Sequence, residues 1–391
     1  MIPPIDRDYI VQTLTDLVRI NSVNPGIAAN GPGEREIAAY LTCAMTRLGL
    51  EAVVFEPQPG RATAVGTLRG SGSGRSLMLN GHADTVGIEG MTDPFSARIS
   101  NGRLYGRGAH DMKGSLAACL GAVKALVDAG VRLGGDLVVA GVADEECASL
   151  GTADLIEHVD VDGAIVTEPT NLDICLAHKG FIWIEVQTEG RAAHGSRFAE
   201  GVDANMRMGR FLAGLDQLEQ RLRARSRHPL VGPPSLHAAT LRGGSGPSTY
   251  ADRCTLTIER RTVPGETEAE AVAEIQAIVD GLAAADPTFR ASVKPIFTRE
   301  PFEVPAEAPI VAALGAAAER VLGRRPPFVG DSPWMDAALL DAAGIETVVF
   351  GPRGQGEHSA VEWVDLESVV QTAAVLAQAA IEYCSAGEGR R

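Results

Sequence analysis

The sequence has few of the features that mark exported or membrane-inserted proteins. Its six cysteines are dispersed among 391 residues and form no CxxC pair, so a disulfide framework is not expected. No apolar run approaches the roughly 20 residues that cross a bilayer, and the N-terminus lacks a basic segment followed by an apolar one. We therefore expect a cytoplasmic protein with reduced cysteines and no membrane contact.

Basic residues are also in the minority. The chain has 35 Lys and Arg against 50 Asp and Glu, which gives a formal net charge of -15 at pH 7. This charge disfavours nucleic acid and anionic membrane surfaces as partners, but acidity alone names no substrate. The length is large for one core and, with 45% hydrophobic residues, suggests two domains.

Segments typical of helices and strands alternate up to about residue 177. We expect helices over 6–20, 33–50 and 113–130, and strands over 52–57, 63–68, 76–80, 136–143 and 163–167. This βαβ alternation predicts an α/β fold with a mostly parallel sheet and flanking helices.

The pattern changes near Lys179. Strands are expected over 181–190, 235–244, 253–263 and 291–298, and helices over 204–226 and 266–285. The order strand, helix, two strands, helix, strand predicts an inserted α+β domain of the split βαβ type. The α/β pattern then resumes near 308. We place the catalytic domain at 1–178 and 295–391, and the inserted domain at 179–294.

Side chains of the types that commonly bind metal ions lie just past several of these strand-like segments. They are His82, Asp84, the pair Glu145 and Glu146, Glu168 and His358, with Asp111 in GRGAHDMKG completing the set. Taken singly, each has a structural alternative, such as a hydrogen-bonded histidine or an acid at a helix start. In open α/β sheets, however, residues at the carboxyl ends of strands converge on one crevice. Their recurrence there favours a two-metal hydrolase.

A series of motifs extends this interpretation across nearly the whole chain. In order, they are HAD, GRGAHDMKG, ADEE, TEPT, AHKG, GRAAHGS, ERRTVPGE, MDAALLDAAGIETVVFGP and GEHSAVEWV. The ordered set resembles the M20 metallopeptidases, a family that includes acetylornithine deacetylase, succinyl-diaminopimelate desuccinylase, aminoacylase and glutamate carboxypeptidase. The resemblance implies a catalytic α/β domain with two zinc ions, sometimes cobalt or manganese. It also implies an inserted lid domain that often forms a homodimer.

The resemblance assigns a role to each metal-ligand candidate. His82 and Glu168 would bind one ion, Glu146 and His358 the other, and Asp111 would bridge them. Imidazole and carboxylate ligands suit zinc.

Two further carboxylates would assist the metals. Asp84 resembles the carboxylate that orients a ligand imidazole. Glu145 resembles the general base that takes a proton from water and delivers it to the leaving amine.

Two lid residues also match the family pattern. His194 corresponds to a histidine that reaches the partner subunit's active site and hydrogen-bonds the oxyanion; the alternative is a helix-capping residue. Arg261 corresponds to an arginine that holds a substrate carboxylate, for which a bidentate fork is suited. The alternative for Arg261 is a surface charge on a strand.

The chain departs from the family pattern in two places. Ser248, in GGSGPSTYAD, stands where the family usually has an Asn that contacts the substrate or oxyanion, so the donor geometry of this pocket is in question. Glu357, directly before His358, stands where alanine is common. Its carboxylate either adds negative charge near the site or faces solvent.

These observations predict a binuclear metal hydrolase that cleaves the amide bond of an N-acyl amino acid or short peptide. A dipeptidase or carboxypeptidase of the same family is the alternative enzyme. A metal-binding or ligand-binding relative without turnover is the alternative outside the enzymes. The presence of Glu145 argues against the last, because a binding protein needs no general base.

Overall fold

The computed structural model describes residues 2–385, which form two compact units. Among these residues, the first unit contains 2–176, Val304–Val329 and 335–385, and the second contains Ala177–Glu303 and Gly330–Trp334. The predicted inserted domain, 179–294, lies within the second unit. Its expected end falls inside a strand, Ala291–Arg299, that pairs with a neighbour of the same unit up to Arg299. The second unit therefore extends past residue 294.

The first unit is built on a central sheet whose strands run in the order β1-β2-β6-β3-β7-β15-β8. The strands are β1 (Glu51–Gln58), β2 (Arg61–Leu68), β6 (Leu137–Val142), β3 (Leu77–His82), β7 (Gly163–Val166), β15 (Glu346–Val349) and β8 (Ile174–His178). The four middle strands are parallel, whereas β1, β2 and β8 run antiparallel to their neighbours. This arrangement confirms the predicted mostly parallel α/β sheet.

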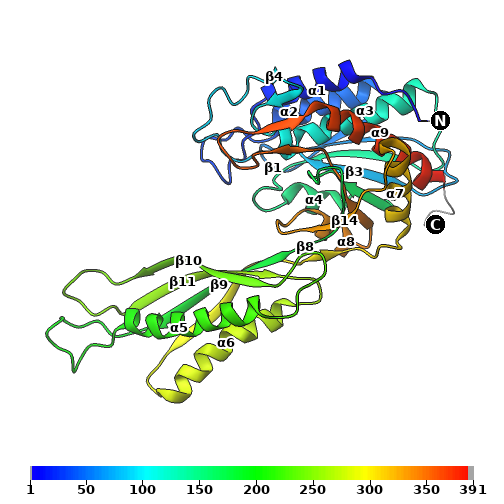
Figure 1. The fold of residues 1–391 in the computed structure, drawn as a ribbon. Helices are drawn as coiled ribbons and strands as arrows, with labels where there is room; N and C mark the ends of the chain where they lie inside the picture. The colour runs from blue at the N-terminus through cyan, green and yellow to red at the C-terminus, as the bar shows by residue number, and fades with distance from the viewer. Residues whose placement is uncertain (1, 386–391) are drawn as a thin grey trace. The chain divides into compact units, whose positions relative to one another are not determined.

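Helices lie on both faces of this sheet (Figure 1). They are α1 (Arg7–Arg19), α2 (Arg35–Arg47), α3 (Gly114–Asp128), α4 (Leu150–Leu155), α7 (Pro309–Leu322), α8 (Ala337–Ala342) and α9 (Leu366–Ser385). α3 and α9 pack together and against β3, whose residues are all buried. α1 begins after Asp6, whose side chain accepts a hydrogen bond from the backbone N–H of Tyr9, as expected for an N-cap.

A small sheet joins two distant parts of the first unit. Its strands pair in the order β16-β17-β5-β4. They are β16 (Gly354–Gln355), β17 (Trp363–Asp365), β5 (Arg103–Tyr105) and β4 (Arg98–Ser100). Because β5 precedes Asp111 and β16 and β17 flank His358, this sheet brings the segments of both residues together.

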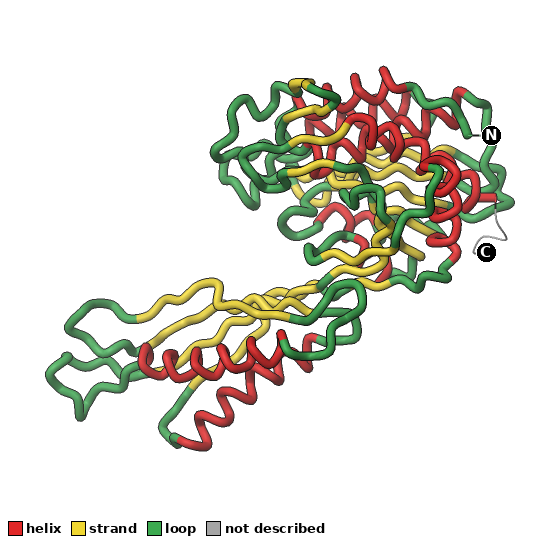
Figure 2. Tube along the Cα trace, viewed as in Figure 1, coloured by secondary structure: helices red, strands yellow, loops and turns green. Residues whose placement is uncertain are grey.

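The second unit has the predicted order of strand, helix, two strands, helix, strand. Its strands lie beside its two helices (Figure 2). These elements are β9 (Gly180–Glu189), α5 (Ala204–Arg223), β10 (Ser235–Gly243), β11 (Arg253–Thr262), α6 (Glu268–Ala285) and β12 (Ala291–Arg299). The strands form an antiparallel sheet in the order β10-β11-β9-β12. Inward residues of β9 and β11 alternate with outward ones and form a core with α5 and α6. This is the split βαβ arrangement.

The chain leaves the first unit and re-enters it at neighbouring positions. Two short strands, β13 (Phe302–Glu303) and β14 (Phe328–Asp331), pair with β8. The backbone N–H of Val304 donates a hydrogen bond of 2.8 Å to the carbonyl oxygen of Leu176. The inserted segment therefore starts and ends at one point of the sheet.

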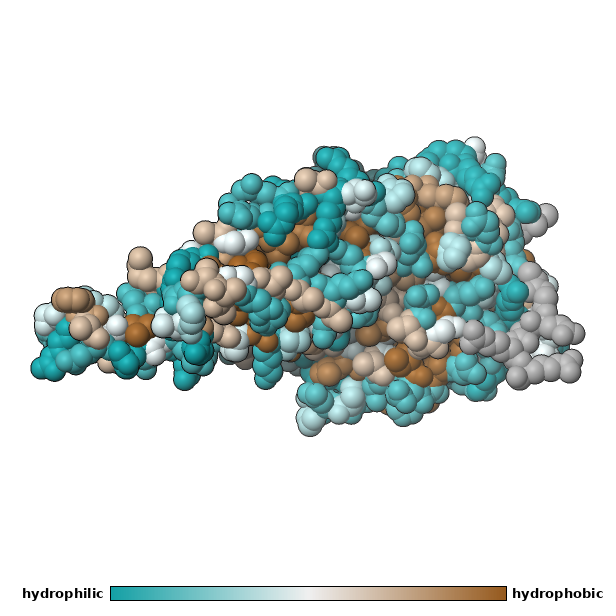
Figure 3. Space-filling view, turned by 90° about the horizontal axis from the view of Figure 1, so that it is seen from below, coloured by the Kyte–Doolittle hydropathy of each residue, from teal (hydrophilic) through white to brown (hydrophobic). Residues whose placement is uncertain are grey.

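Within residues 2–385, none of the helices combines the length and apolar composition that a bilayer crossing requires. On the face seen in Figure 3, hydrophobic residues lie in small groups among hydrophilic ones.

Candidate metal centre

Two histidines from distant parts of the chain face the same carboxylate, that of Asp111. His82 is the last residue of β3, and its Nε2 lies 3.0 Å from Oδ1 of Asp111. His358 has a left-handed backbone conformation (φ 56°), and its Nε2 lies 3.4 Å from Oδ2 of Asp111. The carboxylate thus presents one oxygen to each imidazole.

Three glutamates surround this arrangement. Glu145 and Glu146 lie in the turn after β6, and Glu168 follows β7, so all three stand at carboxyl ends of parallel strands. Oε1 of Glu168 lies 3.5 Å from Nε2 of His82, and Oε2 of Glu146 lies 3.0 Å from Nε2 of His358. Each histidine therefore lies beside the glutamate with which the sequence analysis pairs it.

The side chains form two groups in which all ligand atoms lie within 4.8 Å of one another. One group is His82, Glu145 and Glu168, and the other is His82, Asp111 and Glu146. Glu145, expected to act as a base, therefore also lies within metal-binding reach of His82 and Glu168. In this geometry Glu145 can serve either as the base or as a metal ligand.

Asp84 contacts the site in a different way from the one expected. Nδ1 of His82 lies 2.9 Å from the backbone carbonyl oxygen of Asp84, whereas the nearest carboxylate oxygen is 3.7 Å away. The main chain of Asp84 therefore orients the imidazole. Its carboxylate instead accepts hydrogen bonds from the backbone N–H groups of Glu145, at 3.1 Å, and Glu146, at 3.3 Å.

The electrostatics of the cluster suit bound cations. Burial raises the pKa of Glu145, and the Glu168 carboxylate raises it further. Burial would also raise the pKa of Asp111, but its hydrogen bonds with His358 and His82 outweigh this effect and lower the pKa. Close acidic groups of this kind repel one another unless protons or cations lie between them.

Hydrogen bonding gives a second indication of fit. Among residues 2–385, Oε1 of Glu146 is buried without a hydrogen-bond partner. A buried carboxylate oxygen without a donor is costly, and a cation would satisfy it. The imidazole and carboxylate donors of the cluster suit zinc and related divalent ions.

Glu362 supports the segment of Asp111 and was missed by the sequence analysis. Its buried carboxylate accepts hydrogen bonds from Arg107, at 2.7 Å, and from the backbone N–H groups of Gly108, His110 and Asp111. These contacts fix the irregular turn Ala109–Lys113 in which Asp111 lies. A single sequence offers no signal for this role beyond an acid in the motif GEHSAVEWV.

Glu357, expected either to add negative charge near the site or to face solvent, pairs with a histidine. Its Oε1 lies 2.7 Å from Nε2 of His110, a buried residue beside Asp111. The pair links the residue before His358 to the residue before Asp111.

The three lid candidates belong to the second unit. Nδ1 of His194 lies 2.8 Å from Oγ of Ser196, and His194 forms an isolated β-bridge with Thr249. The backbone N–H of Gly195 donates to the carbonyl oxygen of Ser248 at 2.8 Å, so the segments of His194 and Ser248 lie side by side.

Arg261 lies apart from that pair along the chain, on β11. Its Nε donates to Oε1 of Glu259 at 2.8 Å, and its guanidinium lies over the ring of Phe181. The side chain is 31% exposed.

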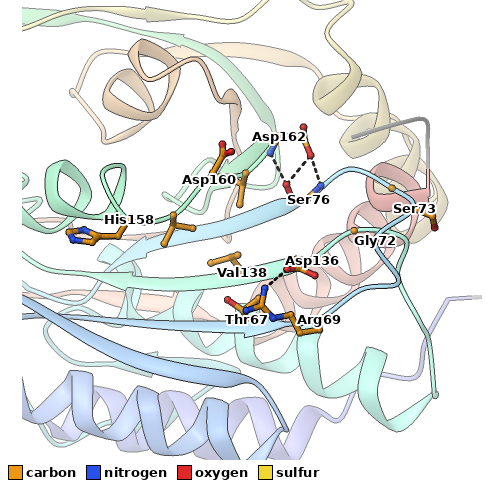
Figure 4. Close-up of a pocket in the computed structure, with 14 residues that line it drawn as sticks. Thr67, Arg69, Gly72, Ser73, Ser76, Asp136, Val138, His158, Asp160 and Asp162 are labelled. Carbon is orange, nitrogen blue, oxygen red and sulfur yellow. Dashed lines mark hydrogen bonds and ion pairs between the residues drawn. The ribbon is translucent and has the colours of Figure 1, made fainter. Parts of the chain in front are cut away.

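A cavity of about 690 Å³ lies at the opposite ends of the parallel strands (Figure 4). Its lining includes Ser76, Asp136 and Asp162, which precede β3, β6 and β7 respectively. None of the residues that line it belongs to the carboxylate cluster. We therefore assign the chemistry to the cluster and not to this cavity.

Two deacylating enzymes, by their names, are similar to this chain over nearly its whole length. The N-formyl-4-amino-5-aminomethyl-2-methylpyrimidine deformylase of Bacillus subtilis is 30% identical over 413 residues, covering 97% of this chain and 95% of the relative. The acetylornithine deacetylase of Myxococcus xanthus is 32% identical over 381 residues, covering 95% of this chain and 97% of the relative.

Solved structures share the fold. The aminopeptidase PepT of Bacillus cereus superposes on this chain with a TM-score of 0.80 at 20% identity. The match covers 97% of this chain and 99% of the PepT chain. The M20 metallo-carboxypeptidase of Sulfolobus solfataricus has a TM-score of 0.77 at 18% identity, with 96% and 99% covered. The family model of peptidase family M20/M25/M40 matches residues 78–382. The chain therefore belongs to peptidase family M20/M25/M40, and is a hydrolase of amide bonds.

Proposed function

We propose that the protein is a two-metal hydrolase that removes the acyl group from an N-acyl amino acid. The observation that carries this proposal is the placement of Asp111 between His82 and His358, with one carboxylate oxygen toward each. His82 and Glu168 would hold one ion, Glu146 and His358 the other, and Asp111 both. Zinc is the proposed metal, with cobalt or manganese as substitutes.

The chain's own residues supply the acid-base chemistry. Bound divalent ions would polarise the substrate carbonyl and promote deprotonation of water. Glu145 takes the proton of the attacking water and returns it to the leaving amine, a role that suits a buried carboxylate with a raised pKa. The backbone N–H of Glu145 is held by Asp84, which places this carboxylate beside the metal ligands.

The similar sequences favour deacylation over peptide cleavage. The relatives at 30% and 32% identity are named as a deformylase and a deacetylase, both of which remove a small acyl group from an amine. The peptidases among the solved structures are at 20% identity or less, so their likeness concerns the fold. A dipeptidase or carboxypeptidase activity is the second candidate, because the matching family model is that of a peptidase family.

We further propose that the second unit acts as a lid and dimerises. β10 is an edge strand of its sheet, and most of its residues are exposed. An unpaired edge of this kind can add a strand from a second copy. In such a homodimer His194 would complete the partner's site, while Arg261 and Ser248 would contact the substrate. The six free cysteines support a cytoplasmic location.

A panel of substrates tests the proposed function. The protein, freed of metal and then reloaded with zinc, cobalt or manganese, would be given N-formyl, N-acetyl and N-succinyl amino acids beside matched dipeptides. We expect hydrolysis of an N-acyl amino acid only after reloading. Faster cleavage of dipeptides would establish the second candidate, and binding without turnover would overturn both.

A further inference from the structure

A buried polar network lies behind the acidic turn of the metal centre. It consists of Asn24, Glu34, Arg61, Asp84 and Asp144, all of which are buried. They come from five separate segments, so the fold and not the local sequence brings them together. Asn24, Glu34 and Arg61 belong to none of the motifs discussed above.

Arg61 is the only cation in the network. Its Nε and Nη2 donate to the two carboxylate oxygens of Glu34 at 2.9 and 2.6 Å, which is a bidentate pair. The same Nη2 also lies 2.7 Å from Oδ1 of Asp144, and Nη1 donates to Oδ1 of Asn24 at 3.1 Å. A lysine has the same charge but cannot make these contacts together.

Asn24 lies between two carboxylates. Its Nδ2 donates to Oδ2 of Asp84 at 2.7 Å and to Oδ1 of Asp144 at 3.0 Å. The orientation of the amide follows from its other end, because Oδ1 accepts from Arg61 and from the backbone N–H of Gly26. An amide is suited to this place because it donates to both acids without adding charge.

The network ends in the backbone of Glu145 and Glu146. Asp84 accepts hydrogen bonds from both of their N–H groups. Asp144 precedes them in a left-handed conformation (φ 71°), and its carbonyl oxygen accepts from the N–H of Ala148 at 3.0 Å. The position of the turn therefore depends on the two aspartates that Asn24 and Arg61 hold.

We propose that Asn24 and Arg61 are positioning residues that set where the Glu145 and Glu146 carboxylates stand around the metal ions. The proposal rests on the proposed two-metal site. Without the Asn24 donor, Asp84 and Asp144 each lose a side-chain hydrogen bond, and Asp144 keeps its contact with Arg61, so their hold on the turn weakens. A shift of about 1 Å in a reacting group can cost about 100-fold in rate.

Two variants of Asn24 separate geometry from charge. Asn24→Leu and Asn24→Asp are of similar size to Asn24; the first removes the donor without adding charge, whereas the second adds an acid between two carboxylates. We expect both to lower kcat by about 10- to 100-fold with little change in KM. Both should also weaken binding of the second cobalt ion and alter the visible cobalt spectrum, which is measured with the metal alone. If charge alone mattered, Asn24→Asp would bind cobalt more tightly than the natural protein.

Arg61→Lys tests the same contacts from the other end. It should reproduce the kcat and cobalt effects, and it provides the test if neither Asn24 variant folds. The matched control is Arg35→Lys, because Arg35 forms an exposed pair with Glu56 at 2.6 Å. That variant should keep the natural kcat and cobalt spectrum.

The outcomes distinguish this inference from the proposed function. If the natural protein binds no cobalt, the two-metal function fails. If the natural protein binds two ions, and folded Asn24 or Arg61 variants match it in kcat and cobalt spectrum, only the positioning role fails.

Discussion

Oδ1 of Asp111 lies 3.0 Å from Nε2 of His82. The other oxygen of the same carboxylate faces His358 at 3.4 Å. A carboxylate in this position can contact two cations, one through each oxygen, and would hold them at the short separation that two-metal hydrolases use.

Replacement of Asp111 should therefore disturb both metal positions. We expect Asp111→Ala to lose metal from both sites and to show no turnover, as measured by elemental analysis and activity after gel filtration. The control is Asp128→Ala, since Asp128 is an exposed carboxylate paired with Lys124. One ion that stays tightly bound in Asp111→Ala would argue against a bridging carboxylate.

The adjacent glutamates should differ in their effects. Glu145→Gln should keep both metals and lose about 10²- to 10⁴-fold in kcat, the usual contribution of a positioned acid-base group. Glu146→Gln should lose metal, because Oε2 of Glu146 lies beside His358 and its Oε1 is buried without a hydrogen-bond partner in residues 2–385. Metal content and single-turnover rates separate the two variants. Equal metal loss in both would make Glu145 a ligand.

Removal of the metals should make stability depend on pH. Burial and neighbouring acids raise the pKa of Glu145 and Glu168 in the metal-free protein. An acid with a raised pKa stabilises the fold below its ordinary value, and this contribution disappears as the pH rises through the raised value. The Tm of chelated protein should therefore fall, relative to metal-loaded protein, as the pH rises above the ordinary glutamate value of 4.5. Parallel Tm curves would contradict this expectation.

Subunit exchange tests the role of His194. His194→Ala and Glu145→Ala chains, each inactive alone, should regain part of the activity when mixed, because one site of the heterodimer has an intact base and an intact histidine. His158→Ala, which changes an exposed histidine of the first unit, is the control and should be active alone. If subunits exchange without any recovery, His194 does not act on the partner's site.

Arg261 should determine the preference for a free carboxylate. Amidated substrates should react about 10-fold more slowly or worse, which corresponds to about 1.4 kcal/mol, and Arg261→Ala should remove the difference. Arg253→Ala, at the start of the same strand, is the control. An unchanged carboxylate preference in Arg261→Ala would exclude the arginine from recognition.

We expect Ser248→Asn to change the preferred substrate size and not the metal content.

The convergence of the candidate metal ligands could be predicted because it follows from strand direction. His82 ends a buried strand, Glu146 and Glu168 each follow one, and parallel strands place their ends together. The alternating pattern of 181–190 likewise indicated a sheet with one covered face, as β9 has.

Side-chain partners from distant segments could not be predicted. Glu362 and Asn24 make their contacts through tertiary packing, and nothing in the neighbouring sequence indicates which backbone groups they meet. For the same reason, the sequence did not show that Asp84 holds His82 through its main chain and the acidic turn through its carboxylate. Element order follows from periodicity, whereas these contacts depend on three-dimensional proximity.

The hydrogen bond between Val304 and Leu176 has a consequence for how such proteins diversify. Because the inserted segment enters and leaves at adjacent positions, its length can change without moving the strands that lead to His82, Glu146 and Glu168. Exchange of one insert for another would then alter which substrates are admitted while the hydrolytic machinery stays constant. If the second unit acts on the substrate as proposed, the junction would allow substrate range to vary separately from bond cleavage.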